Sequence, residues 1–261
     1  MANALHLRVF SLALALCTLP LTATAKDKSI VLHKTDAIVT TVDFDGRLSR
    51  FPNLHPAVLE EASHDCEMQL REAEASRRND PRAFGGKPWT FEVSYHFRSE
   101  VGRYVSVLKT ETSYTGGAHP NTAVGTWIWD HNGKRKVDFY KLLPDAREDG
   151  PTLSALSKLV RQGLVADKKR RGIEVADPEN DEWLKHVQAK VDKIGSPSFA
   201  PSTVTGKSSG LTFHFSPGEV GPYAEGVSVA FVPWQAAVPL LKPDLKGLFA
   251  GERPANDLKD D

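Results

Sequence analysis

The chain has very few cysteines. Only Cys17 and Cys66 occur in its 261 residues, and Cys17 lies in an apolar segment near the N-terminus. If that segment is removed, Cys66 is the one thiol left and no internal disulfide can form. Cys66 belongs to a run in which Val58, Ala62, Cys66 and Leu70 recur at four-residue spacing. This pattern favours a buried, inert thiol over a nucleophile.

Sequence signatures of common catalytic sites are also scarce. His-Glu-x-x-His, paired cysteines and a phosphate-binding glycine loop are absent, and we expect no nucleophile elbow. Asp43-Phe44-Asp45-Gly46 resembles the acidic motif of polysaccharide deacetylases but lacks the His-x-x-x-His partner, so we interpret it as a strand end running into a turn. His96, His119 and His214 are a candidate zinc set, although ordinary hydrogen-bonded histidines are the favoured interpretation. We predict no cofactor, no metal and no assignable catalytic residue.

Neither sign of charge is in excess. The chain has 33 Lys and Arg against 33 Asp and Glu, which gives no electrostatic reason to expect nucleic acid as a partner.

Long apolar runs are missing as well, since a membrane helix needs about 20 apolar residues. The longest run follows Arg8 and is succeeded by Pro20 and Ala23-Thr24-Ala25, the order of a secretory signal. We predict a signal peptide at residues 1–25, cleavage near Ala25, and a periplasmic or secreted protein without a membrane span. Leu occupies the position before Cys17 where a lipoprotein signal needs a small residue, so we expect no lipid anchor.

The densest local feature is the turn Tyr114-Thr115-Gly116-Gly117-Ala118-His119-Pro120-Asn121-Thr122. It lies between two segments that alternate apolar and polar residues, as half-buried strands do. Glycines, proline and asparagine restrict such a turn to few backbone shapes. Two interpretations stay open: a difficult turn whose His119 caps backbone groups, and a functional loop that presents His119.

Strands and helices are predicted in separate blocks. Alternation predicts strands at 28–33, 37–44, 89–98, 103–114, 123–130, 134–139, 198–205, 211–215 and 227–232. Apolar spacing of three and four predicts helices at 57–78, 152–169 and 179–194, and a short one within 233–241. The fold class is therefore α+β, with antiparallel sheets packed against a few helices. It forms one composite domain or two subdomains, 26–146 and 147–250, with a polar tail at 251–261 that we expect to be disordered.

Two charged runs are assigned to helix ends. Lys168-Lys169-Arg170-Arg171 is expected to complement the dipole of the preceding helix and face solvent. The acidic run 177–182 is expected to start the helix at 179–194, since it lacks the alternating ligands and central glycine of a calcium loop.

Several motifs in order carry a family resemblance. They are the turn at 114–121, the Asn132-Gly133-Lys134 hairpin, the segment 137–143, and Phe215-Ser216-Pro217-Gly218-Glu219-Val220-Gly221-Pro222-Tyr223-Ala224-Glu225-Gly226. Over residues 29–247 the chain resembles a family of exported bacterial proteins of unknown function. That family includes the extracellular lysozyme-binding domain of the anti-sigma factor RsiV and the N-terminal domain of the peptidoglycan deacetylase PdaC.

The resemblance implies an exported recognition module for a protein or glycan of the cell envelope, with lysozyme or peptidoglycan fragments as partners. The expected contact residues are Tyr114, His119, Asn121, Glu219 and Tyr223, because stiff loops that carry such side chains lose little entropy on binding. One alternative is an envelope glycan hydrolase or deacetylase that uses His119 and Glu219. Another is a structural envelope protein without a small ligand.

Overall fold

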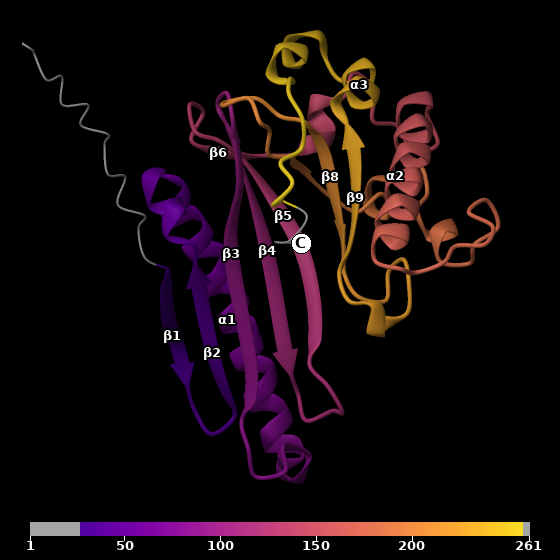
Figure 1. Cartoon of the computed structure of the whole chain (residues 1–261). Coiled ribbons are helices and arrows are strands. Elements are labelled where there is room, and N and C mark those ends of the chain that lie inside the picture. Colours follow the sequence, from indigo (N-terminus) through magenta and orange to yellow (C-terminus); the bar gives the residue numbers. More distant parts are fainter. Residues whose placement is uncertain (1–26, 258–261) are drawn as a thin grey trace, which may run out of the picture.

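A computed structural model describes residues 27–257. Figure 1 shows a large sheet with one long helix packed along it, and a smaller sheet with a second long helix beside it. The predicted α+β class is confirmed. The predicted signal peptide at residues 1–25 lies outside the described residues. Within residues 27–257 no helix combines the length and apolar character needed to cross a bilayer.

The larger sheet contains six strands in sequence order. They are β1 (Lys28–Lys34), β2 (Ile38–Phe44), β3 (Trp89–Val101), β4 (Tyr104–Tyr114), β5 (Asn121–Asp130) and β6 (Arg135–Val137). Neighbours are antiparallel except β2 and β3, which are parallel. Parallel neighbours need a crossover connection, and α1 (Leu54–Asn79) supplies it.

The side of α1 that faces the sheet carries the apolar repeat read from the sequence. Val58, Ala62 and Cys66 are fully buried among inward-facing side chains of the sheet. Burial raises the pKa of the Cys66 thiol, and the neighbouring His64 is exposed. The prediction of a buried cysteine is confirmed.

The smaller sheet is antiparallel and is covered by α2 (Pro151–Arg170). Its strands are β7 (Ser196–Phe199), β8 (Gly210–Phe215) and β9 (Ser228–Pro233). At Gly163 α2 approaches β9 so closely that a Cβ atom would lie 2.8 Å from the backbone oxygen of Phe231. Glycine is therefore required there by the spacing between helix and strand. The short helix α3 (Trp234–Ala237) follows β9.

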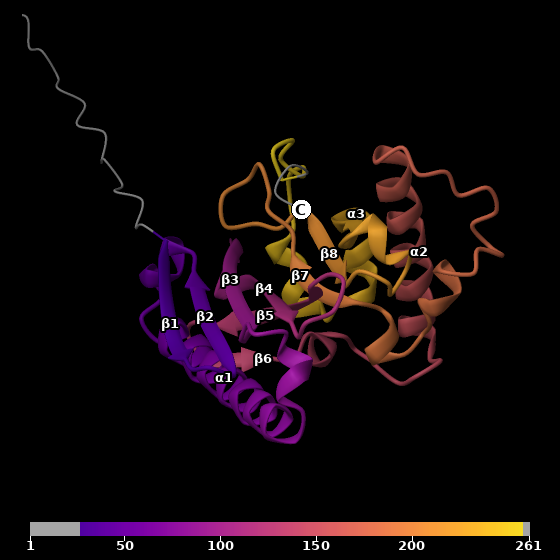
Figure 2. The same cartoon turned by 90° about the horizontal axis from the view of Figure 1, so that it is seen from below.

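The two sheets are joined through β7, as the view in Figure 2 shows. Thr126 of β5 donates its hydroxyl to the carbonyl of Pro197 at 2.6 Å, and Ser106 of β4 accepts from the amide of Phe199 at 3.0 Å. Tyr104 and Ile128 of the larger sheet belong to the hydrophobic cluster under α2. The two parts thus share core side chains, and the boundary near residue 146 stays a prediction.

The prediction of a helix at 179–194 is wrong. The segment contains two single 3-10 turns, Leu184–His186 and Val191–Lys193. The carboxylate of Asp181 accepts from the amides of Trp183 and Leu184, at 2.9 and 2.8 Å. Such local side-chain bonds stabilise turns in competition with a helix, even though the apolar spacing is helical.

The prediction of disorder from residue 251 onward is wrong for residues 251–257. Trp234 donates its indole N–H to the carbonyl of Gly251 at 3.1 Å, and Thr203 and Glu252 exchange two hydrogen bonds. Asp257 is buried. The polar composition of this segment reflects the ion pairs that it forms.

Candidate functional site

The two special loops of the sequence lie side by side. One is the tip of the β4–β5 hairpin, residues 115–120, and the other joins β8 to β9, residues 216–227; we call them the paired loops. The rings of His119 and Tyr223 stack with centroids 4.6 Å apart. The Tyr223 hydroxyl donates to the carbonyl of Pro120 at 2.7 Å and accepts from the amide of Thr122 at 3.1 Å. Tyr223 is thus the side chain that fastens one loop to the other.

A second contact joins the loop after β8 to the backbone of β5. The hydroxyl of Ser216 accepts from the amide of Val124 at 3.1 Å, and the Ser216 amide donates to the carboxylate of Glu219 at 2.6 Å. Glu219 therefore shapes its own loop. The sequence did not single out Val124, because it takes part in this contact through its backbone amide, which leaves no side-chain signal.

The predicted site residues are brought together only in part. His119 and Tyr223 meet. Tyr114 and Asn121 are the last residue of β4 and the first residue of β5, on either side of the loop, where they pair with strand neighbours. His119 Nδ1 lies 2.9 Å from the carbonyl of Pro120. In the described part of the chain no hydrogen bond joins His119 to Glu219, so this arrangement lends no support to an acid–base pair.

The C-terminal end of α2 anchors the second loop. The ammonium of Lys168 lies 2.5 Å from the carboxylate of Glu225, and the Lys168 side chain is only 4% exposed. Arg171 donates to the backbone oxygens of Glu225 and Val227. The expectation that this basic run faces solvent is therefore wrong for Lys168, which pairs with a carboxylate remote in sequence.

A cavity of about 340 Å³ lies beside the second of the paired loops. His186, Asp192, Lys193 and Glu219 contribute polar groups to it. His186 Nδ1 lies 3.0 Å from the carbonyl of Glu219. Glu219 therefore contacts His186 through its backbone carbonyl and Ser216 through its carboxylate.

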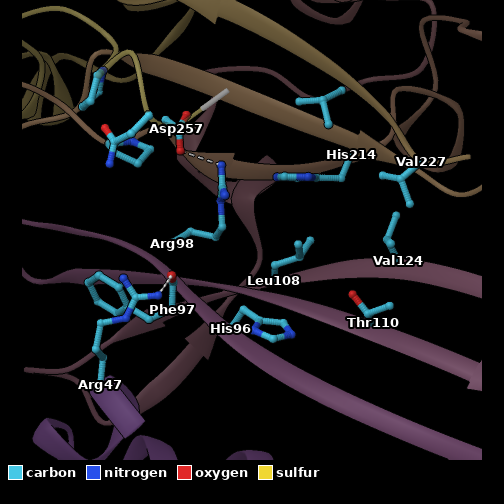
Figure 3. Close-up of a pocket in the computed structure, with 14 residues that line it drawn as sticks. Arg47, His96, Phe97, Arg98, Leu108, Thr110, Val124, His214, Val227 and Asp257 are labelled. Carbon is cyan, nitrogen blue, oxygen red and sulfur yellow. Dashed lines mark hydrogen bonds and ion pairs between the residues drawn. The ribbon is translucent and has the colours of Figure 1, made fainter. Parts of the chain in front are cut away.

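A larger cavity of about 660 Å³ lies between the two sheets, and Figure 3 shows the side chains around it. His96 of β3 and His214 of β8 line it, whereas His119 lies in the paired loops. The candidate three-histidine site is therefore not assembled. Among residues 27–257 no group of three or more His, Cys, Asp or Glu side chains is placed to hold a metal ion.

His214 is the most perturbed titratable group of this cavity. Its ring is buried, and Nε2 lies 3.1 Å from the hydroxyl of Ser198. Burial, together with the smaller effect of the nearby cations Arg98 and Arg253, lowers the pKa of His214 to about 3. His214 is therefore a neutral hydrogen-bonding group at neutral pH.

One short match to Gly-x-Ser-x-Gly does occur in the chain, at Gly206-Lys207-Ser208-Ser209-Gly210. A nucleophile elbow needs an exposed serine between a strand and a helix. Ser208 is instead fully buried in the connection leading into β8, with its hydroxyl 2.6 Å from the carbonyl of Gly210. The segment is therefore a structural turn and not a nucleophile elbow.

Comparisons with known proteins match part of the chain to a family and point to no activity. Residues 147–235 match the family described as "Protein of unknown function (DUF3298)". This segment contains α2, the smaller sheet and the second of the paired loops. No curated protein matches the chain.

Two crystal structures of DUF3298 family proteins are similar over most of the chain. The one from Bacteroides fragilis NCTC 9343 has a TM-score of 0.54 at 15% identity and covers 86% of this chain and 98% of its own. The one from Pseudomonas aeruginosa PAO1 has a TM-score of 0.50 at 14% identity, with coverage of 87% and 95%. At these identities the likeness shows a shared fold, and neither description mentions RsiV or PdaC.

Proposed function

We propose that this chain, whose residues 147–235 match the DUF3298 family, is an exported recognition module that binds a protein or glycan of the cell envelope. The paired loops are its contact surface. The observation that carries the proposal is the stacked His119–Tyr223 pair, which joins two loops about a hundred residues apart and leaves the Tyr223 side chain 38% exposed.

Preorganisation supports this choice of surface. Binding surfaces gain affinity when their side chains are ordered before the partner arrives. Here two hydrogen bonds to the Tyr223 hydroxyl and the ion pair of Lys168 with Glu225 hold the loop from both sides. Tyrosine also offers a large contact area with few rotatable bonds, a property of residues that dominate binding energy.

The choice of partner rests on the family resemblance of the sequence. The RsiV domain, which has the Gly-Gly-Ala-His-Pro-Asn type of turn, binds lysozyme, so lysozyme is the first protein to test and peptidoglycan fragments are the first glycans. Export is part of the proposal, and N-terminal sequencing of the protein recovered from a periplasmic extract would reveal whether the chain is cut after Ala25.

Isothermal titration of the mature protein with lysozyme, and separately with muropeptides, tests the binding. We expect His119→Ala to weaken binding at least tenfold, because it removes one ring of the stacked pair. Tyr223→Phe keeps the ring but loses both hydrogen bonds, so it should weaken binding by about fivefold or more, since two net hydrogen bonds contribute about 1–3 kcal/mol.

Val31→Ala is the matched control, since Val31 is exposed on β1 at the opposite edge of the sheet (Figure 1). It should bind like the unmodified protein. If neither lysozyme nor muropeptides bind at high micromolar concentration, or if all three variants bind equally, the proposal is wrong.

A further inference from the structure

A buried carboxylate beside the large cavity is held by two guanidinium groups, and Arg98 and Asp257 line the cavity wall. Arg98 of β3 lies 2.8 Å from one oxygen of Asp257, and Arg253 Nε lies 2.5 Å from the other. The side chains of Arg98, Asp257 and Arg253 are 6%, 5% and 12% exposed. Charge-assisted bonds of this kind, shielded from water, are the usual way in which proteins bind a carboxylate.

The carboxylate in this site comes from the end of the described chain. Asp257 lies four residues after Arg253, in a turn closed by a bond from its own amide to the carbonyl of Pro254. No strand of either sheet contains it. Asp257 can therefore leave Arg98 without any change in the pairing of the strands.

The space beside Asp257 has the size and lining of a small-molecule site. Its volume of about 660 Å³ is within the usual range of about 300–1,000 Å³ for ligand pockets. Leu108, Val124 and Val229 give it an apolar wall, and His96, Thr110 and His214 add polar groups. In Figure 3 Arg98 reaches from β3 to Asp257, with the ring of His214 directed toward the same space.

We propose that Arg98 and Arg253 form the carboxylate subsite of a ligand-binding cavity, and that Asp257 occupies this subsite until a small ligand bearing a carboxylate replaces it. The ligand places its carboxylate on Arg98 and its body against the apolar wall. Asp257 acts as an internal competitor, because a tethered group has an effective concentration in the millimolar range. Val227 of the second paired loop lines this cavity, but Arg98, Arg253 and Asp257 lie outside the paired loops, so either proposal can fail while the other stands.

The test measures binding of paired probes by the full mature chain. N-acetyl-L-alanine and D-glucuronate carry a carboxylate on an amino acid and on a sugar, and N-acetyl-L-alaninamide and D-glucose are their neutral counterparts. We expect the carboxylate probes alone to bind, and to bind the Asp257→Asn variant at least tenfold more tightly than the unmodified protein. Whichever carboxylate binds more tightly identifies the body of the ligand.

The double variant Arg98→Gln with Asp257→Asn is the matched control and should lose this binding. If carboxylate and neutral probes bind Asp257→Asn equally, or none binds, the proposal is overturned. A purely structural ion cluster would lower the melting temperature of Asp257→Asn without recovery on addition of either carboxylate probe, whereas a ligand site would show recovery.

A measurement on the unmodified protein covers the case in which Asp257→Asn does not fold. Hydrogen exchange at the Asp257 amide should become faster as a carboxylate probe displaces the side chain and the turn to Pro254 opens. Unchanged exchange at saturating concentrations of both carboxylate probes would refute displacement.

Discussion

Because the imidazole of His214 is buried, the free energy of unfolding should depend on pH by an amount that can be calculated. Burial, reinforced by Arg98 and Arg253, lowers the pKa of His214 in the folded protein to about 3, against an ordinary value of 6.5. Between these two values the unfolded chain binds a proton that the folded chain excludes. The free energy of unfolding must therefore fall as the pH drops below 6.5, and this contribution is fully present only above that value.

The magnitude follows from the two protonation equilibria. A pH of 5.0 is about 1.5 units below the ordinary pKa of 6.5, so the imidazole is protonated in the unfolded chain. This protonation stabilises the unfolded state by about 2 kcal/mol relative to pH 7.5. Because the whole stability of a domain is about 5–15 kcal/mol, a change of this size is easily measured.

Urea unfolding of the mature protein and of His214→Gln, at several pH values from 7.5 to 5.0, provides the measurement. The variant lacks the imidazole, so the difference in unfolding free energy between the two proteins should shrink by about 2 kcal/mol over this range. His64→Gln, which removes an exposed histidine of α1, is the control for loss of a histidine elsewhere in the chain. If His214→Gln runs parallel to the unmodified protein, the reasoning about His214 is refuted.

Three further outcomes follow from packing and charge. Gly163→Ala should destabilise the protein by about 1–3 kcal/mol in thermal or urea unfolding, because the new methyl group collides with the β9 backbone, whereas the exposed control Gln162→Ala should be close to neutral. Lys168→Met should lower the melting temperature by leaving Glu225 without its buried ammonium; adding Glu225→Gln should recover part of the loss, and the absence of any recovery would contradict the pairing. Cys66 should react with a thiol reagent only after unfolding, because it is buried and its pKa is raised; rapid reaction of the native protein would contradict this placement.

Much of the fold could be predicted because its elements are amphipathic at their own period. The apolar repeat through Cys66 predicted α1, and the alternation of apolar and polar residues on both sides of the Gly-Gly-Ala-His turn predicted β4 and β5. The failure at 179–194 has a local cause. Apolar spacing there is helical, but the carboxylate of Asp181 bonds the next amides and keeps the backbone in a turn.

The candidate sites could be predicted less well, because their parts meet across long stretches of chain. The turn at His119 was recognisable alone, but its contact with Tyr223 depends on the larger and smaller sheets being joined through β7. Lys168 illustrates the same limit. A lysine at a helix end is usually solvated, and only the folded chain brings Glu225 to it.

The sharing of Tyr104 and Ile128 between the two parts of the molecule has a consequence for the family-matching segment. These side chains belong to the larger sheet, yet they fill the hydrophobic cluster beneath α2. A chain that started at residue 147 would leave that surface open to water, and β7 would lose its hydrogen bonds to Thr126 and Ser106. We therefore expect residues 147–257 produced alone to be insoluble, and to be rescued when residues 27–146 are supplied as a second polypeptide.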